Sequence, residues 1–519
     1  SMEDAKDNTY LKFKYNTVYD CNQKSGQKSA LIISVYNINE FEHNTITMNE
    51  GLLQTRVFEI NNHRGCKLID NNIKNAKYDD GSSVLLCKEV GKSSLSPLEI
   101  SDCIFYNCHG SDIGSIMQIY KLDTKITIKN TTLQKTSNSH SVEVGTWPNK
   151  KTYYKGYFYQ FQCNCNPAVA EFIGCHFLDL ESNAQSGGGI GLLLTNDNDH
   201  ELLFENTNFE RITFNHPTYS GGAISFSSEV NQNQKTKVTV KGCLFNTVTS
   251  KNGGGAIYFN APTKGLTVEN SRFINTYSNI DDIAKGGAIY VKHNEDSSPV
   301  TIKNCYFEET KSKYGGAIYI EWSSDSKSDI LIDGCTFSKT RANSHGFAIT
   351  IEKADSNEVT ISNCNFNDCV DKKDFFALNL DVSNLNFLYN NIVFSNKNEC
   401  GGCIILEKIR NHLFNGNLFK NYQFDDTNTD IKVSGGINCF SLDLYNSFTF
   451  INNTFDNILG NNQGRCIRFI DIPYNKMTLR NNTVKNCLNG GPLFYFRFNN
   501  KIDDFEIESS NFVENSVSE

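Results

Sequence analysis

The chain is poor in methionine, tryptophan and proline. Its 519 residues include four methionines, two tryptophans and eight prolines. Methionine and tryptophan are therefore too scarce to line a core that is repeated many times along the chain. The small number of prolines, together with abundant phenylalanine, tyrosine, threonine and isoleucine, favours an all-β protein.

Long apolar runs and an excess of positive charge are also absent. No stretch approaches the roughly 18 apolar residues that a membrane-spanning helix requires. The formal net charge is −9, with 58 acidic and 49 basic side chains mixed along the chain. Because a nucleic-acid-binding face needs clustered basic residues to displace counterions, we expect no nucleic-acid partner.

Signals for metal ligation and for secretion are missing as well. The ten histidines are scattered and have no metal-ligand spacing. No signal peptide is visible in the sequence, and its opening Ser1-Met2 is typical of a cloning remnant. We therefore expect an excised ectodomain that is held at a membrane only through an anchor outside this sequence.

A short motif recurs with a period of about 30 residues, a spacing typical of solenoids, propellers or arrays. It consists of two glycines, an alanine and then alternating apolar residues. The clearest copies are Gly221–Phe226, Gly254–Phe259, Gly286–Val291 and Gly315–Ile320, and weaker copies continue to Gly491–Phe496. Alternation with a period of two predicts a strand whose fourth and sixth motif positions face inward.

A second motif, with a turn residue, a small residue, any residue and then phenylalanine, lies between copies of the first. Six cysteines occupy its small position: Cys103, Cys175, Cys243, Cys305, Cys335 and Cys364. They should point inward with the phenylalanine two residues later. Thr131, Thr207 and Ser271 occupy the same position elsewhere, which favours a requirement for small size over disulfide pairing. Disulfides between neighbouring repeats remain an alternative.

These two motifs predict a right-handed parallel β-helix, a solenoid of about a dozen rungs. A propeller needs antiparallel strands joined by hairpins, and no regular hairpin signal is present. Residues 1–80 lack a clean repeat and are expected to form an N-terminal cap and the first strands. The solenoid then spans residues 81–519, with an irregular insertion near 138–166. Since no cap follows the last motif, we expect the native protein to continue beyond Glu519.

The two motifs together resemble the polymorphic membrane protein (Pmp) repeats of chlamydial autotransporters, and similar repeats in surface proteins of protozoan parasites. The matching segments are Gly221–Ile224, Gly254–Ile257, Gly286–Ile289, Gly315–Ile318, Phe273–Thr276, Phe307–Thr310 and Phe512–Asn515. The resemblance covers roughly Phe105 to Asn515. It implies a β-helix and, as its function, a surface adhesin. Heavy use of asparagine and lysine resembles the composition of proteins from a protozoan parasite.

Tyrosines at the fifth position of the first motif are candidates for ligand binding. Tyr258, Tyr290 and Tyr319 should form an outward-facing stripe beside small alanines. Stacked aromatic rings could bind sugar rings or a partner protein. The simpler interpretation is that tyrosine favours strands and covers its neighbours.

Carboxylates at the seventh position are a candidate metal site. Glu321, Glu352, Asp381 and Glu407 should form a column over four successive rungs. Like charges stacked at strand spacing repel one another, so a bound calcium ion or an acid pair acting on glycans are two interpretations of the column. The simpler interpretation is a solvated strand end neutralised by neighbouring lysines.

Asparagine is frequent at the turn position of the second motif. The series Asn130, Asn206, Asn270, Asn304, Asn363, Asn391, Asn452 and Asn481 could form an amide ladder along the stack. Asn130, Asn452 and Asn481 also begin N-x-Thr sequons and are candidate glycosylation sites. Commitment of these amides to a ladder would block that modification.

Taken together, these features predict an extracellular, cell-surface binding protein whose partner is a host-cell surface protein or glycan. No cofactor is expected apart from the candidate calcium. One alternative is a carbohydrate-active β-helix enzyme, either a polysaccharide lyase or a glycoside hydrolase. We expect binding rather than catalysis, because no aligned basic residues accompany the carboxylate column. A passive structural spacer is the other alternative.

Overall fold

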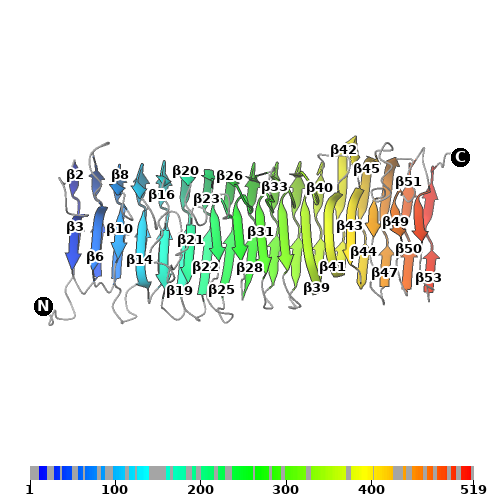
Figure 1. The fold of residues 1–519 in the computed structure, drawn as a ribbon, viewed down its shortest axis with the longest axis horizontal. Coiled ribbons are helices and arrows are strands. Elements are labelled where there is room, and N and C mark those ends of the chain that lie inside the picture. Colours follow the sequence, from blue (N-terminus) through cyan, green and yellow to red (C-terminus); the bar gives the residue numbers. More distant parts are fainter. Residues whose placement is uncertain are drawn as a thin grey trace, which may run out of the picture. The chain divides into compact units, whose positions relative to one another are not determined.

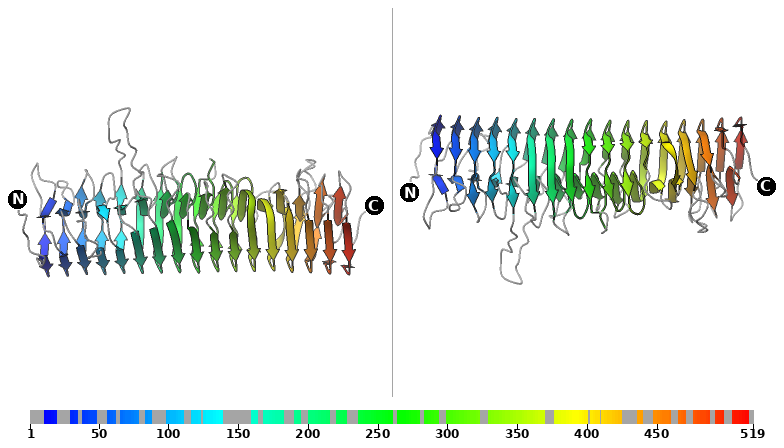
Figure 2. Two further views of the ribbon diagram at one scale, coloured as in Figure 1. Left: turned by 90° about the horizontal axis from the view of Figure 1, so that it is seen from below. Right: turned by 90° about the horizontal axis from the view of Figure 1, so that it is seen from above.

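The computed structural model describes residues 11–19, 29–34, 38–48, 56–61, 65–78, 83–87, 98–110, 116–122, 125–138, 159–163, 168–182, 190–194, 200–215, 220–227, 236–260, 264–279, 283–293, 299–322, 329–369, 376–400, 402–408, 410–424, 436–439, 447–459, 465–470, 476–487, 492–497 and 504–515. The chain divides into two compact units, residues 1–264 and 265–519. Throughout the described residues both units are all-β and contain no helix. Each unit is a β-solenoid in which parallel strands stack coil upon coil (Figures 1 and 2).

In the first unit each coil contributes strands to three faces. The first face is β1 (Leu11–Lys14), β4 (Ile38–Glu42), β7 (Gly65–Ile69), β11 (Leu98–Ser101), β15 (Ile126–Lys129), β19 (Ala168–Ile173), β22 (His200–Glu205) and β25 (Thr236–Lys241). The second face is β2 (Thr17–Tyr19), β5 (Thr45–Thr47), β8 (Asn72–Lys74), β12 (Ile104–Tyr106), β16 (Thr132–Gln134), β20 (His176–Ser182), β23 (Asn208–Phe214) and β26 (Leu244–Ser250). The third face is β3 (Ser29–Ser34), β6 (Arg56–Asn61), β10 (Leu85–Cys87), β14 (Met117–Leu122), β18 (Tyr159–Cys163), β21 (Ile190–Leu194), β24 (Ile224–Ser227) and β27 (Ile257–Asn260). Short strands β9 (Lys77–Tyr78), β13 (His109–Gly110) and β17 (Ser137–Asn138) follow some second-face strands.

The second unit repeats this plan. The first face is β28 (Gly265–Glu269), β32 (Val300–Lys303), β36 (Ile330–Asp333), the later parts of β39 (Ile349–Ser362) and β41 (Phe376–Leu388), β44 (Asn411–Asn415), β47 (Ser447–Ile451), β50 (Lys476–Arg480) and β53 (Asp504–Glu508). The second face is β29 (Arg272–Ile274), β33 (Tyr306–Glu308), β37 (Thr336–Ser338), β40 (Asn365–Asn367), β42 (Asn391–Cys400), β45 (Leu418–Phe424), β48 (Thr454–Leu459), β51 (Thr483–Lys485) and β54 (Asn511–Val513), with short strands β30 (Tyr277–Ser278), β34 (Lys311–Ser312) and β38 (Arg341–Ala342) after three of them. The third face is β31 (Ile289–His293), β35 (Ile318–Trp322), the early parts of β39 and β41, β43 (Gly402–Lys408), β46 (Ile437–Cys439), β49 (Ile467–Ile470) and β52 (Phe494–Arg497).

The third face carries the Gly-Gly motif, and the second face carries the phenylalanine motif. The predicted inward positions are confirmed, since Ile289, Val291, Ile318 and Ile320 are all fully buried. The predicted parallel pairing is confirmed as well, with Ile289 opposite Ile318 in the next coil.

Each coil turns from the first face to the second through one residue with positive φ. These turn residues have φ from 47° to 70° and are Tyr15, His43, Asp70, Asp102, Asn130, Gly174, Asn206 and Gly242 in the first unit and Asn270, Asn304, Gly334, Asn363, Tyr389, Gly416, Asn452, Asn481 and Ser509 in the second. Asparagine, aspartate and glycine predominate because they tolerate this left-handed conformation. Asn391 was predicted to be one of them, but Tyr389 makes this turn and Asn391 lies in β42.

The residue after each turn, which we call the slot residue, points into the core. The slot holds Asn16, Asn44, Asn71, Cys103, Thr131, Cys175, Thr207 and Cys243 in the first unit and Ser271, Cys305, Cys335, Cys364, Asn390, Asn417, Asn453, Asn482 and Ser510 in the second. Its six cysteines are buried as predicted. Burial raises the pKa of the Cys103 thiol to about 11, which keeps it protonated and unreactive.

Small size is only part of what the slot requires, because in many coils the slot side chain also donates a hydrogen bond to a carbonyl of the preceding coil. Cys175 donates to the carbonyl of Ile128 (3.3 Å), and Thr207 donates to that of Phe172 (3.2 Å). Asn417 donates to Phe387 at the equivalent position (2.8 Å). Cysteine, threonine and asparagine share a donor at this distance from the backbone, which explains why they alternate in the slot.

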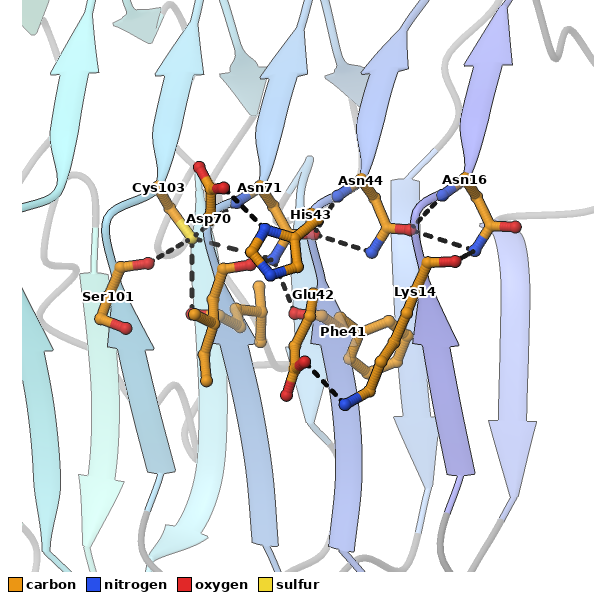
Figure 3. Close-up of polar contacts among 12 residues, drawn as sticks. Lys14, Asn16, Phe41, Glu42, His43, Asn44, Asp70, Asn71, Ser101 and Cys103 are labelled. Carbon is orange, nitrogen blue, oxygen red and sulfur yellow. Dashed lines mark hydrogen bonds and ion pairs between the residues drawn. The ribbon is translucent and has the colours of Figure 1, made fainter.

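Where successive slots hold asparagine, their side-chain amides form a continuous ladder. We had predicted such a ladder at the turn position, which lies one residue before the slot. Figure 3 shows its start, where the backbone and the side-chain amide of Asn16 both donate to Oδ1 of Asn44, at 2.9 and 3.1 Å. Asn44 donates in the same way to Asn71, and its side-chain amide also bonds the carbonyl of Phe13 (2.8 Å). In the second unit the ladder runs from Asn390 to Asn482.

Phenylalanines two residues after the slot form the centre of the core. In the first unit Phe177, Phe209 and Phe245 stack with ring centroids 4.9 Å apart and nearly parallel planes. In the second unit the rings from Phe273 to Phe366 stack at 4.8 Å. This spacing equals the separation of neighbouring strands, so the strand ladder itself sets the ring stacking.

The two glycines of the third-face motif have different structural roles. The first has positive φ, as at Gly315 (60°). The second lies against the backbone of the next coil: a Cβ on Gly316 would lie 2.1 Å from the carbonyl oxygen of Phe347. The motif is therefore required by the sharp entry into the third face and by close packing of coils there.

The cap and the insertion that we predicted involve residues outside the described part of the chain. Residues 11–78 contribute strands to all three faces, and residues before Leu11 are not described. Of the insertion near 138–166, residues 139–158 are likewise outside the described part. Both remain predictions.

Replacement of Asn417 by alanine should destabilise the second unit by about 2–3 kcal/mol, because buried groups of Asn390 and Phe387 would lose their partners. Asn417→Ser keeps a donor and should cost less. Asn411→Ala, which removes exposed contacts to Asn384 and Ser447, is the control and should cost below about 0.5 kcal/mol. Urea unfolding measures all three variants, and equal losses for Asn417→Ala and the control would contradict a stabilising ladder.

Gly316→Ala should destabilise the protein by more than about 3 kcal/mol, because the added methyl group would overlap the backbone of the next coil. Ala317→Gly at the adjacent buried position is the matched control and should cost about 1 kcal/mol through backbone entropy. Thermal unfolding followed by circular dichroism distinguishes them. A Gly316→Ala protein as stable as the control would exclude a close-packing role for the second glycine.

Candidate functional site

Four side chains in the second unit gather on the outside of the third face. Tyr290 comes from β31, Tyr319 and Glu321 come from β35, and Lys285 lies just before the Gly-Gly pair that leads into β31. Parallel register brings them together, since Tyr290 is opposite Tyr319. A backbone bridge between Lys285 and Tyr314 holds the lysine beside the strands. We call these four residues the Lys–Tyr–Glu cluster.

The cluster is held together by one carboxylate and one ammonium group. Nζ of Lys285 is 2.8 Å from Oε2 of Glu321, and the hydroxyl of Tyr290 donates to the same oxygen at 2.9 Å. The ammonium group also lies 4.6 Å from the centre of the Tyr319 ring, a cation–π distance. The two tyrosine rings meet edge to face, with centroids 5.5 Å apart.

These contacts determine the protonation states in the cluster. Burial alone would raise the pKa of the Glu321 carboxyl, but the contacts with Lys285 and Tyr290 outweigh burial and lower it below its usual value. Burial, and next a hydrogen bond to Glu352, raise the pKa of the Tyr319 phenol far above its usual value. At neutral pH Glu321 is therefore an anion, and Tyr319 is a neutral hydrogen-bond donor.

The predicted tyrosine stripe is less exposed than we expected. Tyr319 is 1% exposed and Tyr290 is 8% exposed, so their rings do not form the exposed platform that we expected. Lys285 and Glu321 lie against these rings, which accounts for part of their burial. In the first unit Tyr258 lies in β27 and is half-buried. Of the three predicted tyrosines, Tyr258 thus offers the most accessible ring.

The predicted carboxylate column is interrupted. Glu321 and Glu352 are opposite one another in neighbouring strands. A register shift follows in the next coil, and a second shift places Asp381 opposite Lys408 instead of Glu407. Oδ2 of Asp381 accepts a hydrogen bond from the backbone of Lys353 (3.2 Å).

Nothing in this interrupted column adds support for the predicted calcium ion. Among the described residues, no three histidine, cysteine, aspartate or glutamate side chains lie close enough together to bind a metal. The column instead supplies one carboxylate, Glu321, to the Lys–Tyr–Glu cluster.

The candidate glycosylation sites lie on exposed turns. Asn130, Asn452 and Asn481 have positive φ and exposed side chains. The amide of Asn130 donates to Asp102 (3.1 Å), and that of Asn452 donates to Asn415 (3.0 Å), so these turn amides already make bonds along the stack. Exposure favours modification while these bonds oppose it, and glycosylation remains a prediction.

Lys285 is the site residue that sequence reasoning missed. It precedes the Gly-Gly pair of its motif in a segment with no strand pattern, and its distance from Glu321 along the chain hid their contact. The available signal was that a lysine one position before a Gly-Gly turn projects beside the strands of two successive coils.

Comparison with protein-family models and with curated proteins gave no match to this chain. The described residues form no helix that could cross a lipid bilayer. Function is therefore inferred from the geometry of the Lys–Tyr–Glu cluster.

Glu321→Gln should destabilise the second unit by about 1 kcal/mol at neutral pH, because it removes the half-buried ion pair with Lys285. The folded-state pKa of Glu321 is lowered, so the carboxylate stabilises the fold above its ordinary pKa of 4.5 and loses this effect as the pH falls below that value. The difference between variant and wild type should therefore shrink below pH 4.5.

Urea unfolding at several pH values measures this dependence. Glu309→Gln is the control, because Glu309 makes an exposed ion pair with Lys339 at 3.7 Å and should contribute little. A loss for Glu321→Gln that does not vary with pH would contradict an ionic origin.

Proposed function

We propose that this protein is a cell-surface adhesin that binds a host-cell protein or glycan through the outside of its third face and the adjoining loops. The Lys–Tyr–Glu cluster is the observation that carries this proposal. It places the partly exposed side chains of Lys285 and Glu321 on the outer side of the third face, where the largely buried rings of Tyr290 and Tyr319 hold them in position. Charged and aromatic groups held in fixed positions are typical of protein and sugar recognition.

Binding is favoured over catalysis because the cluster's charged groups are committed to one another. Glu321 accepts from both Lys285 and Tyr290, so it is already neutralised and hydrogen-bonded before any ligand arrives. A fixed, low-entropy surface of this kind suits binding. The core offers no competing site in the described coils, where stacked phenylalanines and slot residues fill the interior.

The resemblance to Pmp repeats supports the same proposal. Under this proposal the protein is an extracellular surface protein of the Pmp-like repeat type from a protozoan parasite, and an anchor outside this chain holds it at the membrane. The fold agrees with that resemblance at the level of a parallel β-helix repeat protein. A host-cell surface is then the natural location of the partner.

A carbohydrate-active enzyme is the second candidate, and one observation favours it. Lys285 lies beside Glu321, and Glu352 is the strand neighbour of Glu321. Two carboxylates and a cation on adjacent strands could divide acid and base roles in cleavage of a sugar chain. The sequence did not lead us to expect a basic residue such as Lys285 beside these carboxylates.

The proposal is tested by passing the purified chain over immobilised glycans and cultured host cells, with and without calcium, and measuring retained protein and released sugar together. Lys285→Ala and Tyr258→Ala should each reduce retention by roughly tenfold. Tyr277→Ala is the matched control, because Tyr277 is 46% exposed but lies on the second-face side of its coil. Retention without released sugar supports an adhesin.

Three other outcomes contradict this proposal in different ways. Released sugar that depends on Glu321 would favour the enzyme. If all three variants are retained as strongly as the wild-type chain, the binding surface lies away from the third face. An absence of retention on every surface would favour a passive spacer.

A further inference from the structure

The first and last coils that the structure describes have strands whose described partners lie on one side only. Among the described residues, β1 and β2 pair only with β4 and β5, and β53 and β54 pair only with β50 and β51. Such edges present rows of backbone donors and acceptors that can pair with another parallel strand. The question for each edge is which strand its sequence fits.

The last coil exposes residues of core type. Phe505, Ile507 and Phe512 are 43%, 50% and 47% exposed, whereas their neighbours one coil earlier, Met477 and Leu479, are at most 1% exposed. At the other end of the chain the inward-facing residues of β1 and β2 are likewise only half-buried. Both ends therefore present apolar surface that a further coil would cover.

We propose that the last coil of one molecule binds the first coil of a second copy, so that the chain assembles head to tail. Alignment of the two coils on their turn residues, Ser509 and Tyr15, fixes the register. Phe505 then lies opposite Leu11 of the second copy, and Ile507 lies opposite its Phe13. On the second face Phe512 lies opposite Val18, so that apolar residues meet at every inward position.

The outward charges are complementary in the same register. Glu506 would lie opposite Lys12 of the second copy, and Glu508 would lie opposite its Lys14. Within the second unit Arg480 already pairs with these two glutamates, at 2.9 and 2.8 Å.

Within the first unit, the lysines of β1 face glutamates of the next coil at the same outward positions. Lys14 pairs with Glu42 at 2.6 Å, and Lys12 pairs with Glu40 at 3.8 Å. A head-to-tail junction would therefore extend an alternation of positive and negative rows that both units already use.

The slot column also fits across the junction. The backbone of Asn482 donates to the Ser510 hydroxyl (3.3 Å), as the backbone of Asn16 donates to Asn44 (2.9 Å). In the junction the backbone of Ser510 would donate to Oδ1 of Asn16 in the second copy. Because the two surfaces differ, the contact is heterologous, and each molecule that binds brings a new edge to which the next molecule can add.

Sedimentation velocity of the purified protein over a roughly hundredfold concentration range around micromolar tests this proposal. We expect a series of oligomers that grows with concentration and shrinks at high salt. The double variants K12E/K14E and E506K/E508K should each associate at least about tenfold more weakly, because like charges would face each other. A mixture of the two should associate as wild type does, because each junction then pairs opposite charges.

Ile507→Lys, which turns a charge inward at the edge, is a second variant that does not depend on the charge rows, and it should also abolish association. Lys241→Glu changes a charge in β25, away from both ends, and should leave association unchanged. Circular dichroism confirms that each variant is folded. A protein that stays monomeric throughout, or one whose association survives Ile507→Lys or is not restored in the mixture, would overturn the proposal.

Discussion

Parallel stacking of one coil on the next, held at a single buried slot, is the constraint on which the rest of the structure depends. At that slot a short side chain donates to a carbonyl of the preceding coil, whether it is Cys175, Thr207 or Asn417. The turn residue before it must have positive φ to aim the slot residue inward. Every coil repeats this pair, so each coil takes its register from its neighbour, as expected of a solenoid.

This register decides which residues can occupy each column. Phenylalanines one strand spacing apart stack with nearly parallel planes at 4.8 Å in the second unit, which favours repetition of the same residue. Charges behave in the opposite way, since like charges at the same spacing repel. The outward positions of the first face accordingly place Lys14 against Glu42 and Arg480 against Glu508.

Buried side chains fill the interior of the described coils, so a binding or catalytic site would have to lie on the outer surface. Tyr290, Tyr319 and Glu321 are outward residues of regular strands, yet Lys285 and the mutual contacts of the cluster cover part of their surface. The result is a rigid arrangement whose charges are balanced before any ligand binds. Under the proposed binding function this arrangement would favour recognition, since little side-chain entropy would be lost on contact.

The sequence by itself determined the parallel β-solenoid, the inward phenylalanines and the buried cysteines, because each of these is a periodic feature that depends on local backbone geometry and on burial of one strand face. It did not determine the asparagine ladder. Asn417 and Cys364 occupy equivalent slots in different coils, and what they have in common is a hydrogen bond donated to a carbonyl of the preceding coil. Nor did it determine the Lys285–Glu321 contact or the register shift that separates Asp381 from Glu407. Those features depend on which residue of one coil lies beside which residue of the next, and loops of unequal length between strands hide that alignment until the coils are stacked.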